Sequence, residues 1–244
     1  MSWITYTRYE LLRTFRNRRF FVFSLGFPLI FYWVLAAPKH NQTIGGTPFT
    51  WGLYYMVGLA SFGTMMAMIS SGARIAGERQ SGWTRQLRIS PLTVRAYFRA
   101  KLLTGYTMAL LTLLLLYASA ASLGVSLSAG RWLGMTGLIL VGLLPFAALG
   151  ILIGHLVTTD SVGPVMGGLV SLLAFLGGTW FPITGSGFLH SLGQLLPSWW
   201  LVQAGHVALG GQAWGNRGWI TVAAWTAILA GGAAWAYRRD TGKV

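Results

Sequence analysis

The sequence contains no cysteine and only four acidic residues. Without cysteine the chain can form no disulfide, zinc–thiolate site or cysteine nucleophile. It also lacks the GxxxxGK[ST] phosphate loop, so it does not bind ATP by that mechanism. No carboxylate pair, metal-binding cluster or Ser/His/Asp set occurs in a suitable arrangement. The sequence therefore gives no support to an enzyme that acts alone.

Apolar residues dominate what is present. Of 244 residues, 54% are hydrophobic and 9% are charged, and the mean hydropathy is +0.59. Soluble domains carry about 25% charged residues, and a soluble fold of this size could not hide so much apolar surface. We predict an all-α membrane protein with one transmembrane domain over residues 1–244. About 20 apolar residues cross a bilayer as a helix, and six windows qualify: 20–37, 52–73, 102–123, 132–157, 162–182 and 218–237.

The basic residues indicate how these spans are oriented. If the N-terminus is cytoplasmic, 15 Lys and Arg residues lie on the inner side, and only Lys39, Arg131 and Arg217 lie outside. Cytoplasmic loops carry an excess of Lys and Arg, so both termini are predicted to be cytoplasmic. The net charge of +14 is then mainly a topology signal. Because no nucleic-acid-binding module accompanies it, we expect no nucleic-acid partner.

Two segments outside the spans also have a pattern. Residues 3–17 place Ile4, Leu11 and Phe15 on one side of a helix and Glu10 on the other, which predicts an amphipathic helix in the cytoplasmic interface. It could serve only as a membrane anchor, or it could also touch a cytoplasmic partner. Segment 183–217 is too apolar for a solvated loop and is predicted to form short outer helices that re-enter or lie on the interface.

Ionisable groups are scarce inside the predicted spans. A transporter driven by protons or sodium usually needs such a group within the membrane. The four acids, which are Glu10, Glu78, Asp160 and Asp240, fall at or outside span ends. We therefore expect no buried carboxylate, which argues against a secondary transporter. His155 lies within a span and is expected to be a hydrogen-bonded structural residue. Helix kinks are expected at Pro28 and Pro145. The pairs Gly150/Gly154 and Gly163/Gly167 predict close helix packing, and the second pair also suits a subunit interface.

A basic loop joins the second and third spans. Between Arg74 and Lys101 it holds seven basic residues and one acid. Gly82 should break the preceding helix, after which Trp83 and Leu87 share one face of a short helix. Ser90 is then predicted to cap the next helix, with Pro91 at its first position. Apolar side chains rimmed by basic ones suit a groove in a soluble partner, although a solvated loop on anionic lipid is an alternative.

Two stretches resemble a known family. Residues 78–101, "ERQSGWTRQLRISPLTVRAYFRAK", follow the pattern E-R-x-x-G-x-x-x-x-L-x-x-[ST]-P of the membrane subunits of ATP-binding-cassette type-2 transporters, especially drug-export permeases of the daunorubicin-resistance kind. Residues 177–200 are similar to the same family's stretch after the fifth span, with Pro182 and then Pro197 before aromatic residues. A departure is TGSG at 184–187, where relatives often carry Leu-Pro.

The resemblance implies a mechanism and partners. Two such membrane subunits would pair, and we expect two identical copies rather than two different chains. Two cytoplasmic ATPase subunits would lie beneath them and bind ATP and Mg. This chain would need no cofactor. The loop would be the coupling helix, with Trp83, Leu87 and Arg88 touching the ATPase and Glu78 pairing with a nearby arginine. The full predicted coupling set is Glu78, Arg79, Gly82, Trp83, Leu87, Arg88, Ser90 and Pro91.

The resemblance also implies a location and a cargo. Substrate would pass along the second and fifth spans of a bacterial cell-membrane protein. The candidate pathway residues are Phe62, Met65, Met66, Ile69, Leu172, Phe175, Leu176 and Thr179. A pathway without charge favours a hydrophobic or amphiphilic drug or antibiotic. A polysaccharide or lipid-linked cargo is an alternative, as is a membrane scaffold that recruits a soluble partner and transports nothing.

Overall fold

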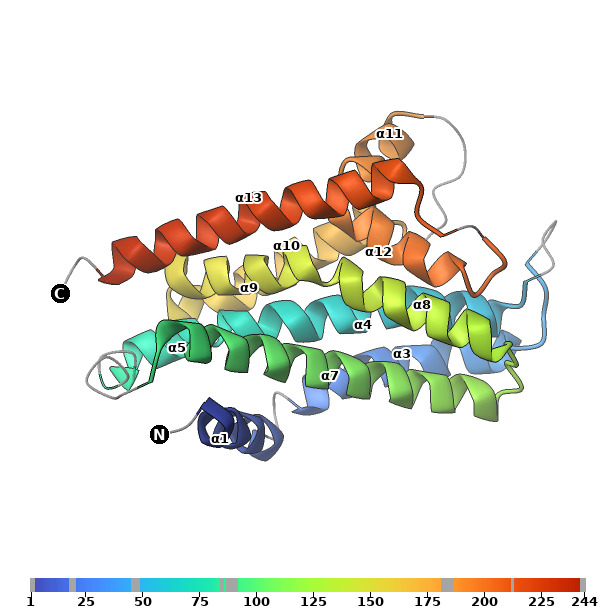
Figure 1. The fold of residues 1–244 in the computed structure, drawn as a ribbon. Helices are drawn as coiled ribbons and strands as arrows, with labels where there is room; N and C mark the ends of the chain where they lie inside the picture. Colours follow the sequence, from blue (N-terminus) through green and yellow to red (C-terminus); the bar gives the residue numbers. More distant parts are fainter. Residues whose placement is uncertain are drawn as a thin grey trace.

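The computed structural model describes residues 3–17, 21–44, 49–83, 86, 92–180, 187–211 and 213–241. Its helices run side by side in a bundle, and the two described ends of the chain lie at the same end as α5 (Figure 1). Five helices in the described part are long and apolar enough to cross a membrane: Trp51–Gln80, Val94–Ser122, Ala129–Leu156, Thr159–Leu176 and Asn216–Asp240. The predicted all-helical class and five of the six predicted spans are thus confirmed.

The first predicted span, 20–37, is less regular. It consists of a π-helical turn η1 (Val22–Gly26), helix α3 (Phe27–Ala36) and a short 3₁₀ turn η2 (Ala37–Lys39). The change from π to α hydrogen bonding comes directly before Pro28, where the sequence predicted a kink. No piece of this segment alone has the length of the five spanning helices, so the sixth crossing stays a prediction.

Helix α4 (Trp51–Ala73) lies in the middle of the bundle and packs against α7 (Val94–Ser122) and α9 (Leu144–Leu156). Glycines permit the close approach to α9: a Cβ atom on Gly150 would lie 2.4 Å from the Ile69 carbonyl oxygen, and one on Gly154 would lie 2.6 Å from the Gly72 carbonyl oxygen. The predicted packing role of the Gly150/Gly154 pair is therefore confirmed. After Arg74 the chain continues as α5 (Ile75–Gln80).

The later spans follow the prediction with shifted ends. The fourth consists of α8 (Ala129–Gly142) and α9, which meet at Leu143, so the kink expected beside Pro145 is confirmed. Helix α10 (Thr159–Leu176) ends six residues before the predicted boundary at 182, and α13 (Asn216–Thr241) forms the last span. A Cβ atom added to Gly163 or Gly167 of α10 would meet no atom within 4 Å, so these two glycines pack against nothing within the described chain.

Short helices follow α10, as the sequence predicted, and their place on the outer side of the membrane stays a prediction. They are α11 (Phe188–Gln194) and α12 (Pro197–His206). Helix α12 packs against α4 and α8, and Ser61 of α4 donates a hydrogen bond of 3.1 Å to the Leu201 carbonyl oxygen. Trp199 is buried, and the centroid of its ring lies 4.9 Å from that of the His190 ring. The departure at 184–187 falls mostly outside the described residues.

Candidate functional site

The polar side of α1 (Trp3–Arg16) faces the interior of the protein. Its buried residues are Tyr6, Thr7, Glu10 and Thr14, while the apolar side chains of Ile4, Leu12 and Phe15 are exposed. The sequence predicted an amphipathic helix here but did not predict that its polar side would be buried against the protein. In a bilayer the apolar side can face lipid, and the polar side then needs partners within the protein.

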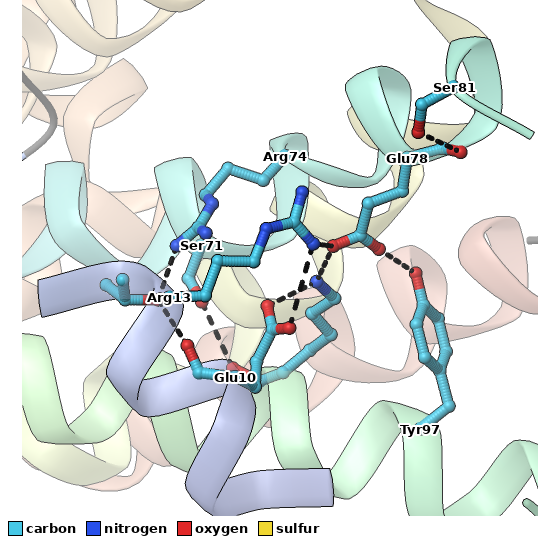
Figure 2. Close-up of polar contacts among 9 residues, drawn as sticks. Glu10, Arg13, Ser71, Arg74, Glu78, Ser81 and Tyr97 are labelled. Carbon is cyan, nitrogen blue, oxygen red and sulfur yellow. Dashed lines mark hydrogen bonds and ion pairs between the residues drawn. The ribbon is translucent and has the colours of Figure 1, made fainter. Parts of the chain in front are cut away.

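Those partners belong to a charge cluster made of Glu10, Arg13, Glu78, Tyr97 and Lys101, of which all but Lys101 are labelled in Figure 2. The Lys101 Nζ atom lies 2.6 Å from Glu10 Oε1 and 2.5 Å from Glu78 Oε1. Tyr97 donates a hydrogen bond of 2.7 Å to Glu78 Oε2, and Arg13 Nη1 lies 2.9 Å from Glu78 Oε1. The predicted pairing of Glu78 with an arginine is thereby found. The expectation of no buried carboxylate was wrong, because the exposed fractions of Glu10 and Glu78 are 4% and 0%.

Neighbouring polar groups hold the cluster in place. Arg74 Nη1 donates to Thr14 Oγ1 at 2.5 Å, and Thr14 in turn donates to the Glu10 carbonyl oxygen at 2.9 Å. Ser71 donates to the Lys101 carbonyl oxygen at 3.2 Å. The cluster therefore joins three elements: α1, the α4–α5 junction at the start of the basic loop, and the first turns of α7.

The electrostatics favour the ionised state of Glu10. Burial by itself raises the pKa of this carboxyl, but the Lys101 ammonium, its hydrogen bond, and the guanidinium groups of Arg74 and Arg13 outweigh burial, so the pKa is lower than its ordinary value. Burial, together with the Glu10 and Glu78 charges, raises the pKa of Tyr6 and keeps its hydroxyl neutral. Removing one partner from a buried ion pair costs roughly 3–5 kcal/mol, because the other charge is left without compensation.

A second ion pair lies on the other side of α5. Arg79 Nε is 2.8 Å from Asp240 Oδ2 near the end of α13, and Arg79 Nη1 donates to the Gly154 carbonyl oxygen at 3.2 Å. The His155 Nδ1 atom is 3.1 Å from the same Asp240 oxygen, so the predicted structural, hydrogen-bonded role of His155 is confirmed. The start of the loop is thus fixed to both α9 and α13.

The loop itself is described only in part. Gly82 has φ of +72°, a conformation that favours glycine, so the predicted helix break is confirmed. Trp83 is 37% exposed, and Gln86 N donates to the Gly82 carbonyl oxygen at 3.3 Å. Leu87, Arg88, Ser90 and Pro91 lie outside the described residues.

Helix α7, which follows the loop, begins later than predicted. Its first residue is Val94, and its N-cap is Thr93, whose side chain accepts a hydrogen bond from Ala96 N at 3.3 Å. The assignment of Ser90 as the cap of the helix that enters the third span was therefore wrong. The extended backbone of Thr93 and its side-chain bond to the residue three positions later are the features of an N-cap.

The predicted pathway residues do not form one surface within a single chain. Phe62, Met65, Ile69 and Thr179 are buried, and Met66 and Leu176 are partly buried. Leu172 and Phe175 are 55% and 52% exposed on α10. Their role in transport stays a prediction.

Comparison with known proteins decides the family. Residues 38–236 match the family described as "ABC-2 family transporter protein". The chain belongs to the ABC-2 transporter family. It is also 31% identical over 207 residues, covering 80% of this chain and 83% of the relative, to the Bacillus subtilis (strain 168) protein named "Putative transport permease YvfS". This ABC-2 protein is accordingly a multi-pass membrane subunit of the permease type, as its loop motif indicated.

Sequence reasoning predicted an arginine beside Glu78 but missed Lys101 and Glu10 as members of the cluster. Lys101 was counted as a loop base, although it lies in α7 and is 2% exposed. A usable signal was the stripe Thr7, Glu10 and Thr14 on α1, which recurs at spacings of three and four. Such a stripe predicts a polar helix face that needs a charged partner. Helix α1 lies before the residues that match the ABC-2 family, so family likeness did not point to it either.

Proposed function

We propose that this ABC-2 protein is the membrane-spanning permease subunit of an ATP-driven exporter in a bacterial cell membrane. A separate cytoplasmic ATPase dimer binds and hydrolyses ATP beneath the basic loop. The two chain ends and the loop lie at the cytoplasmic side, which the excess of basic residues supports. Because both described ends lie at one end of the bundle (Figure 1), an even number of crossings is needed, and η1 with α3 supplies the sixth.

The observation that carries the proposal is the sharing of Lys101 by Glu10 and Glu78. A soluble ATPase that pushes on the exposed Trp83 acts on the loop a few residues after Glu78. Separating Glu78 from Lys101 would break a buried ion pair, and removing one partner of such a pair costs roughly 3–5 kcal/mol. The loop, α1 and the start of α7 therefore move together, and the motion reaches a membrane-spanning helix. A solvated basic loop would need no such fixed connection.

A second copy of the chain is proposed to pack against α10. This helix has exposed Leu172 and Phe175, and its Gly163 and Gly167 are open to a partner. The cargo proposed is a hydrophobic or amphiphilic drug or antibiotic that passes between the two copies along α4 and α10. A polysaccharide or lipid-linked cargo is the alternative, and the transport assay described below distinguishes it from an apolar drug.

The test is coexpression with the ATPase encoded beside the gene. The two proteins should purify together from membranes, and apolar antibiotics should change the rate of ATP hydrolysis. Trp83→Ala should abolish export while membrane insertion persists. Trp219→Ala removes another exposed tryptophan, from the first turn of α13 and far along the chain from the loop, and should behave as the wild type.

Three results would overturn parts of the proposal. Failure of any ATPase to bind would reject the exporter. If Trp83→Ala abolishes ATPase binding but the wild type transports no compound, the protein is a scaffold. Export of a glycan or lipid-linked compound, with no effect of apolar antibiotics, would replace the proposed cargo.

A further inference from the structure

A cavity of about 880 Å³ lies beside the charge cluster, between α1, the α4–α5 junction and the first half of α10. Three arginines line it: Arg13 and Arg16 from α1, and Arg74 from the α4–α5 junction. Arg13 and Arg16 are three residues apart and so lie on one side of the helix. The cavity has a basic wall at the same end of the bundle as the loop.

Cations outnumber carboxylates among the described residues of the cluster and the cavity. The cations of the cluster and cavity are Arg13, Arg16, Arg74 and Lys101, and the buried anions are Glu10 and Glu78, which leaves a surplus of two positive charges. Both carboxylates already bind Lys101, and no ion pair to Arg16 occurs within the described residues. Asp160, next to the lining residue Thr159, would offset one of the two charges. A surplus in a partly enclosed site favours an anionic ligand.

Another part of the lining is apolar and comes mostly from a membrane-spanning helix. Val162, Gly163 and Met166 of α10 line it, and Leu12 of α1 adds to it. A Cβ atom added to Gly163 would meet nothing within 4 Å, so the space beside it is open. Because α10 runs from this cavity along the bundle, its apolar surface continues away from the arginines. One ligand that meets both walls needs an anionic head and an apolar chain.

We propose that this cavity binds an anionic phospholipid, with the phosphate held by Arg13, Arg16 and Arg74 and an acyl chain lying along Val162 and Met166 of α10. Guanidinium groups pair with phosphate oxygens through two parallel hydrogen bonds, which makes arginine the suited residue for such a head. The bound lipid would neutralise the surplus charge beside Glu10 and Glu78 and fill the gap between α1 and α10. Binding of the lipid needs neither the ATPase nor transport.

Native mass spectrometry of the full-length protein purified in detergent tests the proposal. The probe is phosphatidylglycerol of one acyl composition, titrated in parallel with phosphatidylcholine of the same chains and with soluble glycerol phosphate. Two variants change the cavity by different means. Arg16→Gln removes one exposed cation, and Gly163→Leu fills the apolar side where space is open.

Each variant has a matched control. Arg8→Gln removes an exposed arginine of the same helix that does not line the cavity. Gly167→Leu adds the same side chain one turn further along α10, also where no atom lies within 4 Å, outside the cavity. Gly167→Leu also controls for any effect of the added bulk on pairing of two copies. Circular dichroism and size-exclusion chromatography show that each variant is folded.

The expected result is one saturable phosphatidylglycerol per chain, bound in preference to phosphatidylcholine. Arg16→Gln should weaken binding by about fivefold, since each basic residue near an anionic lipid contributes a factor of that order. Gly163→Leu should weaken it by more, and both controls should match the wild type. Equal loss in Arg8→Gln would show general surface attraction and overturn the proposal. Undiminished binding in Gly163→Leu, or full competition by glycerol phosphate alone, would overturn it as well.

Discussion

Lys101 of α7 and Glu10 of α1 form an ion pair of 2.6 Å across 91 residues of sequence. Both side chains are almost completely buried, with side-chain exposed fractions of 1% and 3%. Ile4, Leu12 and Phe15 of α1 are exposed, while Tyr6 packs against Ile75 and Tyr97. The ion pair adds to this limited packing, and it makes the position of α1 depend on the same lysine that binds Glu78.

Lys101→Met should destabilise the protein strongly. The substitution leaves Glu10 and Glu78 buried without their shared cation, and such losses cost roughly 3–5 kcal/mol. The thermal unfolding midpoint in detergent should fall accordingly. In the triple variant Glu10→Gln, Glu78→Gln, Lys101→Met, no buried charge of the three is left unpaired, so most of the stability should return. A Lys101→Met variant as stable as the wild type would contradict the assigned role of Lys101.

The stability contributed by Glu10 should disappear in acid. The folded-state pKa of Glu10 lies below its ordinary value of 4.5, so its contribution is fully present above about that pH and is lost as the pH falls through the folded pKa. The measurement is the difference in unfolding midpoint between wild type and Glu10→Gln from pH 7 down to pH 3. This difference should be constant down to about 4.5 and shrink below. A difference that is independent of pH would refute the ionised pair.

Arg79 and Asp240 should be coupled energetically. Their side chains are 28% and 24% exposed and lie 2.8 Å apart, so solvent weakens the pair, and the coupling should be about 1 kcal/mol. A double-mutant cycle with Arg79→Gln and Asp240→Asn, followed by thermal unfolding, measures it. Arg239→Gln changes the neighbouring residue and should show no coupling to Arg79. A zero value for Arg79 with Asp240 would mean that the pair does not hold the end of α13.

Gly150→Ala should disrupt the packing of α9 on α4. The new Cβ atom would lie 2.4 Å from the Ile69 carbonyl oxygen, so the two backbones must separate, at a cost of about 1–3 kcal/mol. Gly163→Ala is the control on α10, where the added atom meets nothing within 4 Å and alanine favours the helix. Unfolding midpoints should fall for the first variant and stay level or rise for the second. Equal effects would argue against the close α4–α9 contact.

Much of the fold could be predicted because it follows from local signals. Apolar windows identified the spanning helices, Pro145 marked the kink, Gly82 marked the helix break, and the Gly150/Gly154 pair marked close packing. Each of these effects depends on one residue and its neighbours in sequence. The boundaries were less accurate, as the N-cap at Thr93 shows, because several residues before α7 could cap it.

The candidate site was harder to predict because it depends on tertiary contacts. Glu10, Glu78 and Lys101 lie in three separate segments, and each by itself resembles an exposed charge near a span end. The usual expectation that polar helix faces point to water also failed for α1. Lipid on one side and a bundle on the other reverse that expectation, and only the arrangement of α1 against α7 reveals it.

The shared lysine has an evolutionary consequence. A mutation that neutralises position 101 removes the shared cation from two acids at once and leaves Glu78 with the half-exposed Arg13, whereas a mutation at position 10 or 78 leaves Lys101 with one acid. Loss of the lysine therefore costs least after both acids have already changed, which favours one order of the substitutions. Among descendants of this sequence, position 101 should be the last of the three to lose its charge.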